Sequence, residues 1–271
     1  MLNNKKNINV EIIKKLRKKT GIGILTCKKA LIQTKGKINE AIKYLRTTHM
    51  IKINENNIIS NLQGTILAKI SEKYQSGVLI ELNCESDFTT QTKEFKNFGK
   101  KLIKFTLQNN INNIDILKIK FKKEHINIIN KIKENIKIRR MQVLYGNTLG
   151  MYTHRNKIGV IVSAKNMSKK LIKQIAMHIA ANKPKYIDTS NIPLNIINEE
   201  KKIQLNIASQ LNKQYNISKK IVEGQMKKFI NNISLLKQPF ILNTNKNIEQ
   251  LLLEKNAKIN KFIRFELGEN I

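Results

Sequence analysis

The chain has 271 residues, of which 41% are hydrophobic, and its formal net charge is +32. This length predicts about two domains, and the apolar fraction is sufficient for buried cores, which excludes a wholly disordered chain. No run of about 18 apolar residues occurs, which excludes a membrane-spanning helix, and two cysteines are too few for a disulfide framework.

The N-terminal segment is polar and predicts a helical domain. It has neither the apolar core of a secretory signal nor the arginines of a typical transit peptide, so we expect a cytoplasmic protein. The spacing of its apolar residues predicts three short helices. Gly21 and Gly23 are expected to form a tight turn after the first helix, and Thr26 to cap the second. We assign residues 1–50 to this domain and expect a polar linker at 48–62.

The pattern then changes to strands. Residues 64–70 and 77–83 alternate between apolar and polar, which predicts a β-hairpin. The second strand leads into the sequence Asn-Cys-Glu-Ser-Asp-Phe, where the carboxylate of Asp87 stands beside the ring of Phe88. Two interpretations remain open. The pair is an exposed probe for a partner, or Phe88 folds back onto Phe95 while Asp87 only caps the next helix.

A helix with an apolar stripe follows at 93–105, and we expect it to pack on the sheet. The stripe consists of Phe95, Phe98, Leu102 and Phe105. Residues 109–135 are low in complexity and predict a variable helical excursion before a strand at 138–146. We assign residues 56–145 to a first core subdomain.

The second half of the chain repeats this order. A strand at 157–166 is followed by a polar turn and a helix that begins at 169 and ends before Pro184, which indicates a duplicated strand–strand–helix unit. Two long helical patterns at about 190–230 predict a helical hairpin. A further helix and a strand close the second core subdomain, which we assign to residues 146–271.

The sequence offers no catalytic constellation. Its four histidines have no metal-ligand spacing, and no phosphate-binding loop or nucleophile motif is present. Cys27 and Cys84 lie among apolar residues and are expected to be small buried thiols. We therefore expect a binding protein without its own catalysis, and we expect no cofactor and no bound metal.

The large positive charge by itself indicates a polyanionic partner. However, only six of the 51 basic residues are arginine, the residue that base and phosphate recognition favours. The lysines are spread over the whole length, and their abundance alongside asparagine and isoleucine is typical of A/T-rich codon usage. A basic RNA- or ribosome-binding protein is therefore the alternative interpretation, and we expect no specific nucleic-acid partner.

Five segments in register resemble the elongation factor Ts family. They are "TGIGILTCKKAL" at 20–31, "NCESDF" at 83–88, "IAMHIAANKP" at 175–184, the pair "EGQMKKF" at 223–229 and "QPF" at 238–240, and "FIRFELGE" at 262–269. The resemblance implies an α+β fold. It begins with a three-helix domain of ubiquitin-associated (UBA-like) type. Behind it lies a core of two similar sandwich-like halves with antiparallel sheets, into which an antiparallel coiled-coil hairpin is inserted.

The same resemblance implies a function. Members of the family exchange guanine nucleotide on elongation factor Tu, the GTPase that delivers aminoacyl-tRNA. The partner would be elongation factor Tu, in a heterodimer or a dimer of two heterodimers, with no membrane involved. Members of the family often carry a further C-terminal helix beyond the point where this chain ends, at Ile271, which implies a smaller interface.

The resemblance also implies a site. Ser86, Asp87, Phe88 and Thr89 correspond to the segment that dislocates magnesium from the partner. Ser86 stands where threonine is usual and keeps a hydroxyl, whereas Thr89 stands where valine is usual and reduces an apolar contact. Further partner contacts are expected at four positions: Thr20, Gly21, Gly23 and His178.

Overall fold

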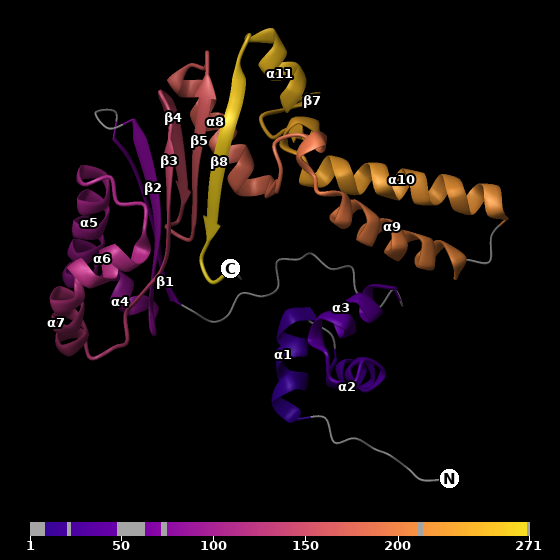
Figure 1. Ribbon diagram of the computed structural model, residues 1–271, viewed down its shortest axis with the longest axis horizontal. Coiled ribbons are helices and arrows are strands. Elements are labelled where there is room, and N and C mark those ends of the chain that lie inside the picture. The colour runs from indigo at the N-terminus through magenta and orange to yellow at the C-terminus, as the bar shows by residue number, and fades with distance from the viewer. Residues whose placement is uncertain (1–8, 21–22, 48–62, 72–74, 211–213, 270–271) are drawn as a thin grey trace. The chain divides into compact units, whose positions relative to one another are not determined.

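The computed structural model describes residues 9–20, 23–47, 63–71, 75–210 and 214–269 (Figure 1). The chain divides into two compact units. One comprises residues 1–59, 192–230 and 270–271, and the other comprises residues 60–191 and 231–269. The domain boundaries assigned from the sequence stay a prediction.

In the first unit, the three predicted N-terminal helices are present. They are α1 (Val10–Thr20), α2 (Ile24–Gln33) and α3 (Ile38–Thr47). Leu16, Leu31 and Leu45 are fully buried and form the centre of their shared core, as the apolar spacing predicted. Helix α2 begins at Ile24 with Gly23 as its N-cap, so Thr26 is not the cap.

The same unit contains most of the helical hairpin, which is formed by α9 (Leu194–Ser209) and α10 (Tyr215–Ile233); residues 231–233 belong to the second unit. Ile203, Ala208 and Val222 are its buried apolar residues. The presence of two long helices in this region matches the helical hairpin predicted there. Its coiled-coil character stays a prediction.

The second unit contains two antiparallel three-stranded sheets. The first has the order β1-β2-β3, with β1 (Gln63–Ser71), β2 (Ser76–Cys84) and β3 (Lys137–Tyr145). The second has the order β4-β5-β8, with β4 (Thr148–His154), β5 (Ile158–Lys165) and β8 (Lys258–Glu266). In both sheets a hairpin is followed by helices and then by a strand that pairs with the hairpin's second strand, which confirms the predicted duplication.

The layers of this unit run helix, sheet, sheet, helix (Figure 1). Ile66, Leu79, Ile161 and Phe265 belong to the core shared by the two sheets. The outer face of the first sheet packs against α5 (Lys93–Gln108), α6 (Ile114–Lys120) and α7 (Lys122–Ile132). The outer face of the second packs against α8 (Lys169–Asn182) and α11 (Ile248–Glu254). Because both faces of β2 are covered, every residue of this strand is buried.

Short elements connect these layers. They are α4 (Asp87–Gln91), η1 (Thr189–Asn191), η2 (Leu235–Lys237), β6 (Pro239–Phe240) and β7 (Asn243–Asn247). Helix α4 is the element that follows β2 directly, and it contains the Asp-Phe pair singled out in the sequence.

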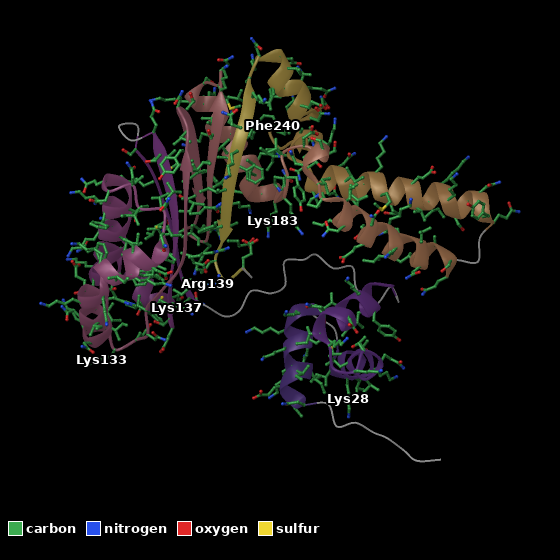
Figure 2. The ribbon with its side chains drawn as sticks, in the orientation of Figure 1. Lys28, Lys133, Lys137, Arg139, Lys183 and Phe240 are labelled. Carbon is green, nitrogen blue, oxygen red and sulfur yellow. The ribbon has the colours of Figure 1, made fainter. Side chains whose placement is uncertain are left out.

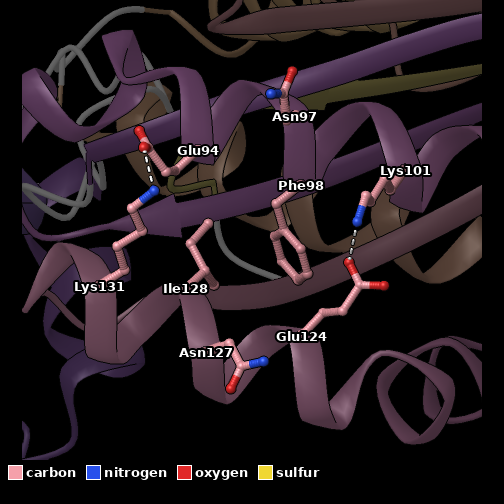
Figure 3. A pocket seen from close by; sticks show the side chains of 8 residues that line it. All are labelled: Glu94, Asn97, Phe98, Lys101, Glu124, Asn127, Ile128 and Lys131. Atoms are coloured by element: carbon pink, nitrogen blue, oxygen red, sulfur yellow. Dashed lines mark hydrogen bonds and ion pairs between the residues drawn. The ribbon is translucent and has the colours of Figure 1, made fainter.

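The low-complexity segment at 109–135 forms α6 and α7, as predicted, and α7 pairs with α5 through a repeated pattern. Both helices carry Glu-x-x-Asn-apolar-x-x-Lys, at residues 94–101 and 124–131. The two copies face each other across a groove of about 480 Å³ (Figure 3). The ion pair Glu94–Lys131 measures 2.8 Å and the ion pair Lys101–Glu124 measures 2.7 Å. Exposed pairs of this kind contribute about 0–1 kcal/mol, so the buried Phe98 and Ile128 supply most of the attachment.

Candidate functional site

The Asp-Phe pair lies on a short turn that is capped at two positions. Ser86 is the N-cap of α4, and its Oγ accepts the amide hydrogen of Thr89 at 3.4 Å. Thr92 is the N-cap of α5, and its Oγ1 accepts the amide hydrogen of Phe95 at 3.3 Å. Side chains therefore satisfy backbone donors at the start of both helices, which fixes the path of the chain between β2 and α5.

Phe88 points away from the core. Its side chain is 82% exposed, the largest fraction among the exposed large hydrophobic residues in the described part of the chain. Phe95 is only 1% exposed. Phe88 therefore does not fold back onto Phe95, and Asp87, which is exposed beside it, is not the helix cap. The structure excludes the second of the two interpretations considered for this turn.

Thr89 differs from its neighbours because its side chain is 3% exposed and faces the interior. Its carbonyl accepts a hydrogen bond from Thr92 Oγ1 at 2.8 Å. The Thr89 side chain is therefore packed inside the turn in the free chain, and its expected contact with a partner stays a prediction. Of the four expected residues, Asp87 and Phe88 are open to solvent and Ser86 is partly buried.

Sequence reasoning missed Glu134, which holds the turn from the segment between α7 and β3. Its Oε1 accepts the hydroxyl hydrogen of Ser86 at 2.6 Å, and its Oε2 accepts the amide hydrogen of Ser86 at 3.0 Å. The Ser86 hydroxyl, helped by the Ser86 amide and the Thr89 side chain, lowers the pKa of Glu134 below its ordinary range. No local signal could have revealed this contact, because 48 residues separate the two partners.

Cys84 is the last residue of β2. Its thiol lies 3.1 Å from the Ser86 carbonyl and is oriented to donate to it. Burial, reinforced by the negative charge of Glu134, raises the pKa of Cys84 to about 11, so the thiol keeps its hydrogen at neutral pH. Both Cys84 and Cys27 are buried and neither forms a disulfide within the described residues, as predicted from their apolar surroundings.

A buried charge cluster is centred on β2, the strand that leads into the turn, and the sequence pattern did not indicate it. Glu81, which is fully buried in β2, accepts hydrogen bonds from Arg139 Nη1 at 2.8 Å and from Arg140 Nε at 2.6 Å. The amide of Gly268 also donates to it at 2.9 Å. Burial acts to raise the pKa of Glu81, but the Gly268 amide and the two arginines outweigh it and lower the pKa.

The cluster extends to the end of β8. Arg140 Nη2 donates to the Glu266 carbonyl at 2.8 Å. The Glu266 carboxylate pairs with Arg264 at 2.7 Å and with Lys183 at 2.8 Å. Lys183 lies just beyond the end of α8 (Figure 2). These contacts join the two sheets to each other and to the end of α8.

His178 is placed differently from the expectation that it contacts a partner. Its side chain is fully buried on α8. Nε2 lies 2.9 Å from Gln238 Oε1, and Nδ1 lies 3.0 Å from the Asn182 amide nitrogen and 3.3 Å from the backbone nitrogen of Ile241. These partners assign the neutral tautomer with hydrogen on Nε2, and burial lowers the pKa of His178. His178 has no exposed surface in the free chain, so its expected contact with a partner stays a prediction.

The predicted N-terminal contact residues differ in their exposure to solvent. Thr20 is 8% exposed and donates from Oγ1 to the Leu16 carbonyl at 2.8 Å, so its side chain belongs to the helical core. Gly21 lies outside the described residues. Gly23 has φ −57°, a value open to any residue, and a Cβ added there meets nothing within 4 Å among the described atoms. The next two residues, Ile24 and Leu25, are 49% and 76% exposed.

Two negative findings concern the described ranges alone. No three His, Cys, Asp or Glu side chains within them gather into a possible metal site. No helix among them combines the length and apolar character needed to cross a membrane.

Comparison with known proteins gives a consistent result. A family model described as "Elongation factor TS" matches residues 85–269, beginning at the turn itself. A protein named Elongation factor Ts from Blochmanniella pennsylvanica is 45% identical over 266 residues, which cover 98% of each chain. Its namesake from Sodalis glossinidius is 43% identical, covering 98% of this chain and 93% of the relative. That from Yersinia pestis is 42% identical, covering 97% and 93%.

Proposed function

The chain belongs to the elongation factor Ts family, and from this premise we propose that it is the guanine nucleotide exchange factor for elongation factor Tu. It binds the GDP-bound GTPase and promotes release of GDP and its replacement by GTP. The relatives' shared name identifies translation elongation as the process. The observation that carries the finer proposal is the outward-facing Phe88, which is 82% exposed beside an exposed Asp87.

The proposed mechanism uses this pair as a probe. Phe88 inserts its ring between elements of the partner's GTPase domain, and Asp87 enters with it. Their entry disturbs the magnesium ion that holds GDP in the partner. Neither residue transfers a proton, and this chain makes or breaks no covalent bond, so it is an exchange factor without catalysis of its own and without a cofactor.

The energetics require only linkage. A protein that binds the nucleotide-free GTPase more tightly than the GDP-bound form weakens GDP binding by the same factor. A thousand-fold faster release corresponds to a barrier lower by about 4 kcal/mol. Loss of one metal ligand and a few displaced phosphate contacts is sufficient for a change of this size.

The N-terminal helices supply a second, docking contact in this proposal. Ile24 and Leu25 are exposed apolar neighbours at the start of α2, and Gly23 leaves open space where a side chain would stand. Close approach of a partner backbone explains a glycine that the chain's own fold does not require. We assign helices α1–α3 to the UBA-like type and the α9–α10 pair to the coiled-coil hairpin. The proposed complex is a heterodimer with elongation factor Tu, and two such heterodimers can pair.

The alternative function is a basic RNA- or ribosome-binding protein, and the net charge of +32 is the observation that favours it. One experiment separates the two functions. The purified chain is mixed with elongation factor Tu loaded with fluorescent GDP, and release is followed with and without competing RNA. We expect strong acceleration of release, and RNA affinity that falls steeply with salt. Tight RNA binding at physiological salt without any effect on GDP release would overturn the proposal.

A further inference from the structure

Asp87 and Phe88 project from a turn whose direction is fixed by a contact outside the turn. Phe88 is exposed, so packing in the free protein does not determine where its ring points. The backbone at residues 86–89 sets this direction instead. What holds Ser86 therefore also determines the position of Asp87 and Phe88.

Glu134 uses both of its carboxylate oxygens on Ser86. Oε1 takes the hydroxyl hydrogen at 2.6 Å, and Oε2 takes the amide hydrogen at 3.0 Å. A serine hydroxyl has one hydrogen, and directing it toward Glu134 leaves a lone pair for the Thr89 amide. The hydroxyl orientation that Glu134 imposes is therefore the orientation that caps α4.

The two segments exchange further bonds. The amide of Asn135 donates to Glu85 Oε1 at 3.4 Å, in the direction opposite to the bonds from Ser86 to Glu134. Within the first segment, the Cys84 thiol donates a hydrogen bond to the Ser86 carbonyl, which is the third bond that holds the serine. Residues 84–86 and 134–135 thus form a reciprocal clamp.

Glu134 is itself held at both sides. The preceding residue, Lys133, ends α7 in the left-handed conformation with φ 63°. Two residues after Glu134, the buried Ile136 places its carbonyl 2.6 Å from His125 Nε2. The strand β3 then begins, and its first residue, Lys137, pairs with Asn83 of β2. The carboxylate is therefore presented from a fixed backbone.

We propose that Glu134 is a positioning residue, which clamps Ser86 so that Asp87 and Phe88 are ordered for the partner before binding. This inference rests on the proposed exchange function. If the turn is already ordered in the free protein, binding does not have to carry the entropy cost of ordering it. The positions of Asp87 and Phe88 also stay within the narrow limits that the partner's site requires. A role confined to stability would leave the turn's order and the exchange rate unchanged once the protein is folded.

The test uses Glu134→Gln, which keeps the size of the side chain but replaces one acceptor oxygen with a donor. The matched control is Glu124→Gln, the same change in the first turn of α7, where the exposed Glu124 carboxylate pairs with Lys101 at 2.7 Å. Three quantities are measured on the full-length proteins: the melting temperature, amide hydrogen exchange at residues 86–91, and the rate of GDP release from elongation factor Tu.

For Glu134→Gln we expect a nearly unchanged melting temperature, faster amide exchange confined to the turn, and GDP release slowed by about tenfold. Ser86→Ala should give a similar defect, and the double variant should be no worse than either single one, because both remove the same clamp. Glu124→Gln should match the unaltered protein in all three measurements.

The outcomes separate this inference from the proposed function. If the unaltered chain does not accelerate GDP release, the proposed function fails, and amide exchange at the turn still reports whether the clamp exists. If the unaltered chain is active and Glu134→Gln matches it in both rate and amide exchange, the positioning role is wrong. A lower melting temperature with unchanged turn exchange would likewise overturn it in favour of a purely structural role.

Discussion

Glu81 Oε2 accepts a hydrogen bond from Arg140 Nε at 2.6 Å, although the glutamate is fully buried in the middle of a sheet. The two residues lie directly opposite each other on neighbouring strands, β2 and β3. The guanidinium of Arg140 also stacks over the ring of Phe265, 4.2 Å from its centroid, in the other sheet. Glu81 thus ties β2, the strand that leads into the exposed turn, to β3, and Arg140 extends the contact to β8.

The first prediction concerns this carboxylate. Glu81→Ala leaves two guanidinium groups without their buried partner, and removing one member of a buried ion pair costs about 3 kcal/mol of unfolding free energy. Urea denaturation measures the loss. Glu124→Ala, which breaks an exposed pair, should cost less than about 1 kcal/mol. Equal losses for the two variants would show that Glu81 contributes no more than a surface charge.

The second prediction concerns pH. Burial lowers the pKa of His178 from its ordinary value of 6.5, so the unfolded chain binds a proton there more readily than the folded one. The stability that the neutral histidine contributes is complete above this value and is lost as the pH falls below it. We expect the unfolding free energy to decrease between about pH 6.5 and 5. His178→Gln should flatten this dependence, and an identical slope in the variant would contradict the assignment.

The third prediction concerns the N-terminal helices. A truncated chain that starts at residue 55 should fold, because the two sheets and their covering helices have cores of their own. It should exchange nucleotide poorly at low concentration, because it loses docking contacts and keeps the probe. Circular dichroism and GDP release over a range of concentrations measure both properties. Full activity of the truncated chain at low concentration would exclude a docking role for these helices.

The fourth prediction concerns Asp87 and magnesium. Asp87→Ala should slow GDP release with little loss of stability, because Asp87 is exposed and Ser86 provides the cap of α4. A cap substitution would instead cost about 1 kcal/mol. The defect should shrink when magnesium is chelated, because the step that Asp87 assists is then already complete. A defect of the same size with and without chelator would separate Asp87 from the magnesium step.

Local patterns in the sequence were sufficient for much of the fold. The three N-terminal helices, the first β-hairpin and the strand and helix that repeat in the second half each follow from the spacing of apolar residues within a short segment, whereas β4 was not predicted. Glu81 was not recognised as a charge centre, because an alternating strand pattern does not show that one polar position faces a second sheet. Only the folded chain brings Ser86 and Glu134 together.

The candidate site divides in the same way. The sequence singled out Asp87 and Phe88, and the structure shows both exposed. The sequence did not show that Thr89 and His178 face inward, because burial depends on the packing of distant elements. Both residues are polar and buried, and their side chains bond to residues distant in the sequence, Thr89 to Glu134 and His178 to Gln238.

The most direct test of the exchange mechanism is the rate of GDP release from elongation factor Tu, measured by stopped flow with Phe88→Ala. The matched control is Ile119→Ala, which removes another exposed apolar side chain, 75% exposed on α6. We predict slower release with Phe88→Ala, unchanged release with Ile119→Ala, and nearly unchanged melting temperatures for both. Truncating a buried phenylalanine would instead cost about 3–5 kcal/mol of stability. If elongation factor Tu releases GDP as fast with Phe88→Ala as with the unaltered chain, the proposed role of Phe88 as a probe is wrong.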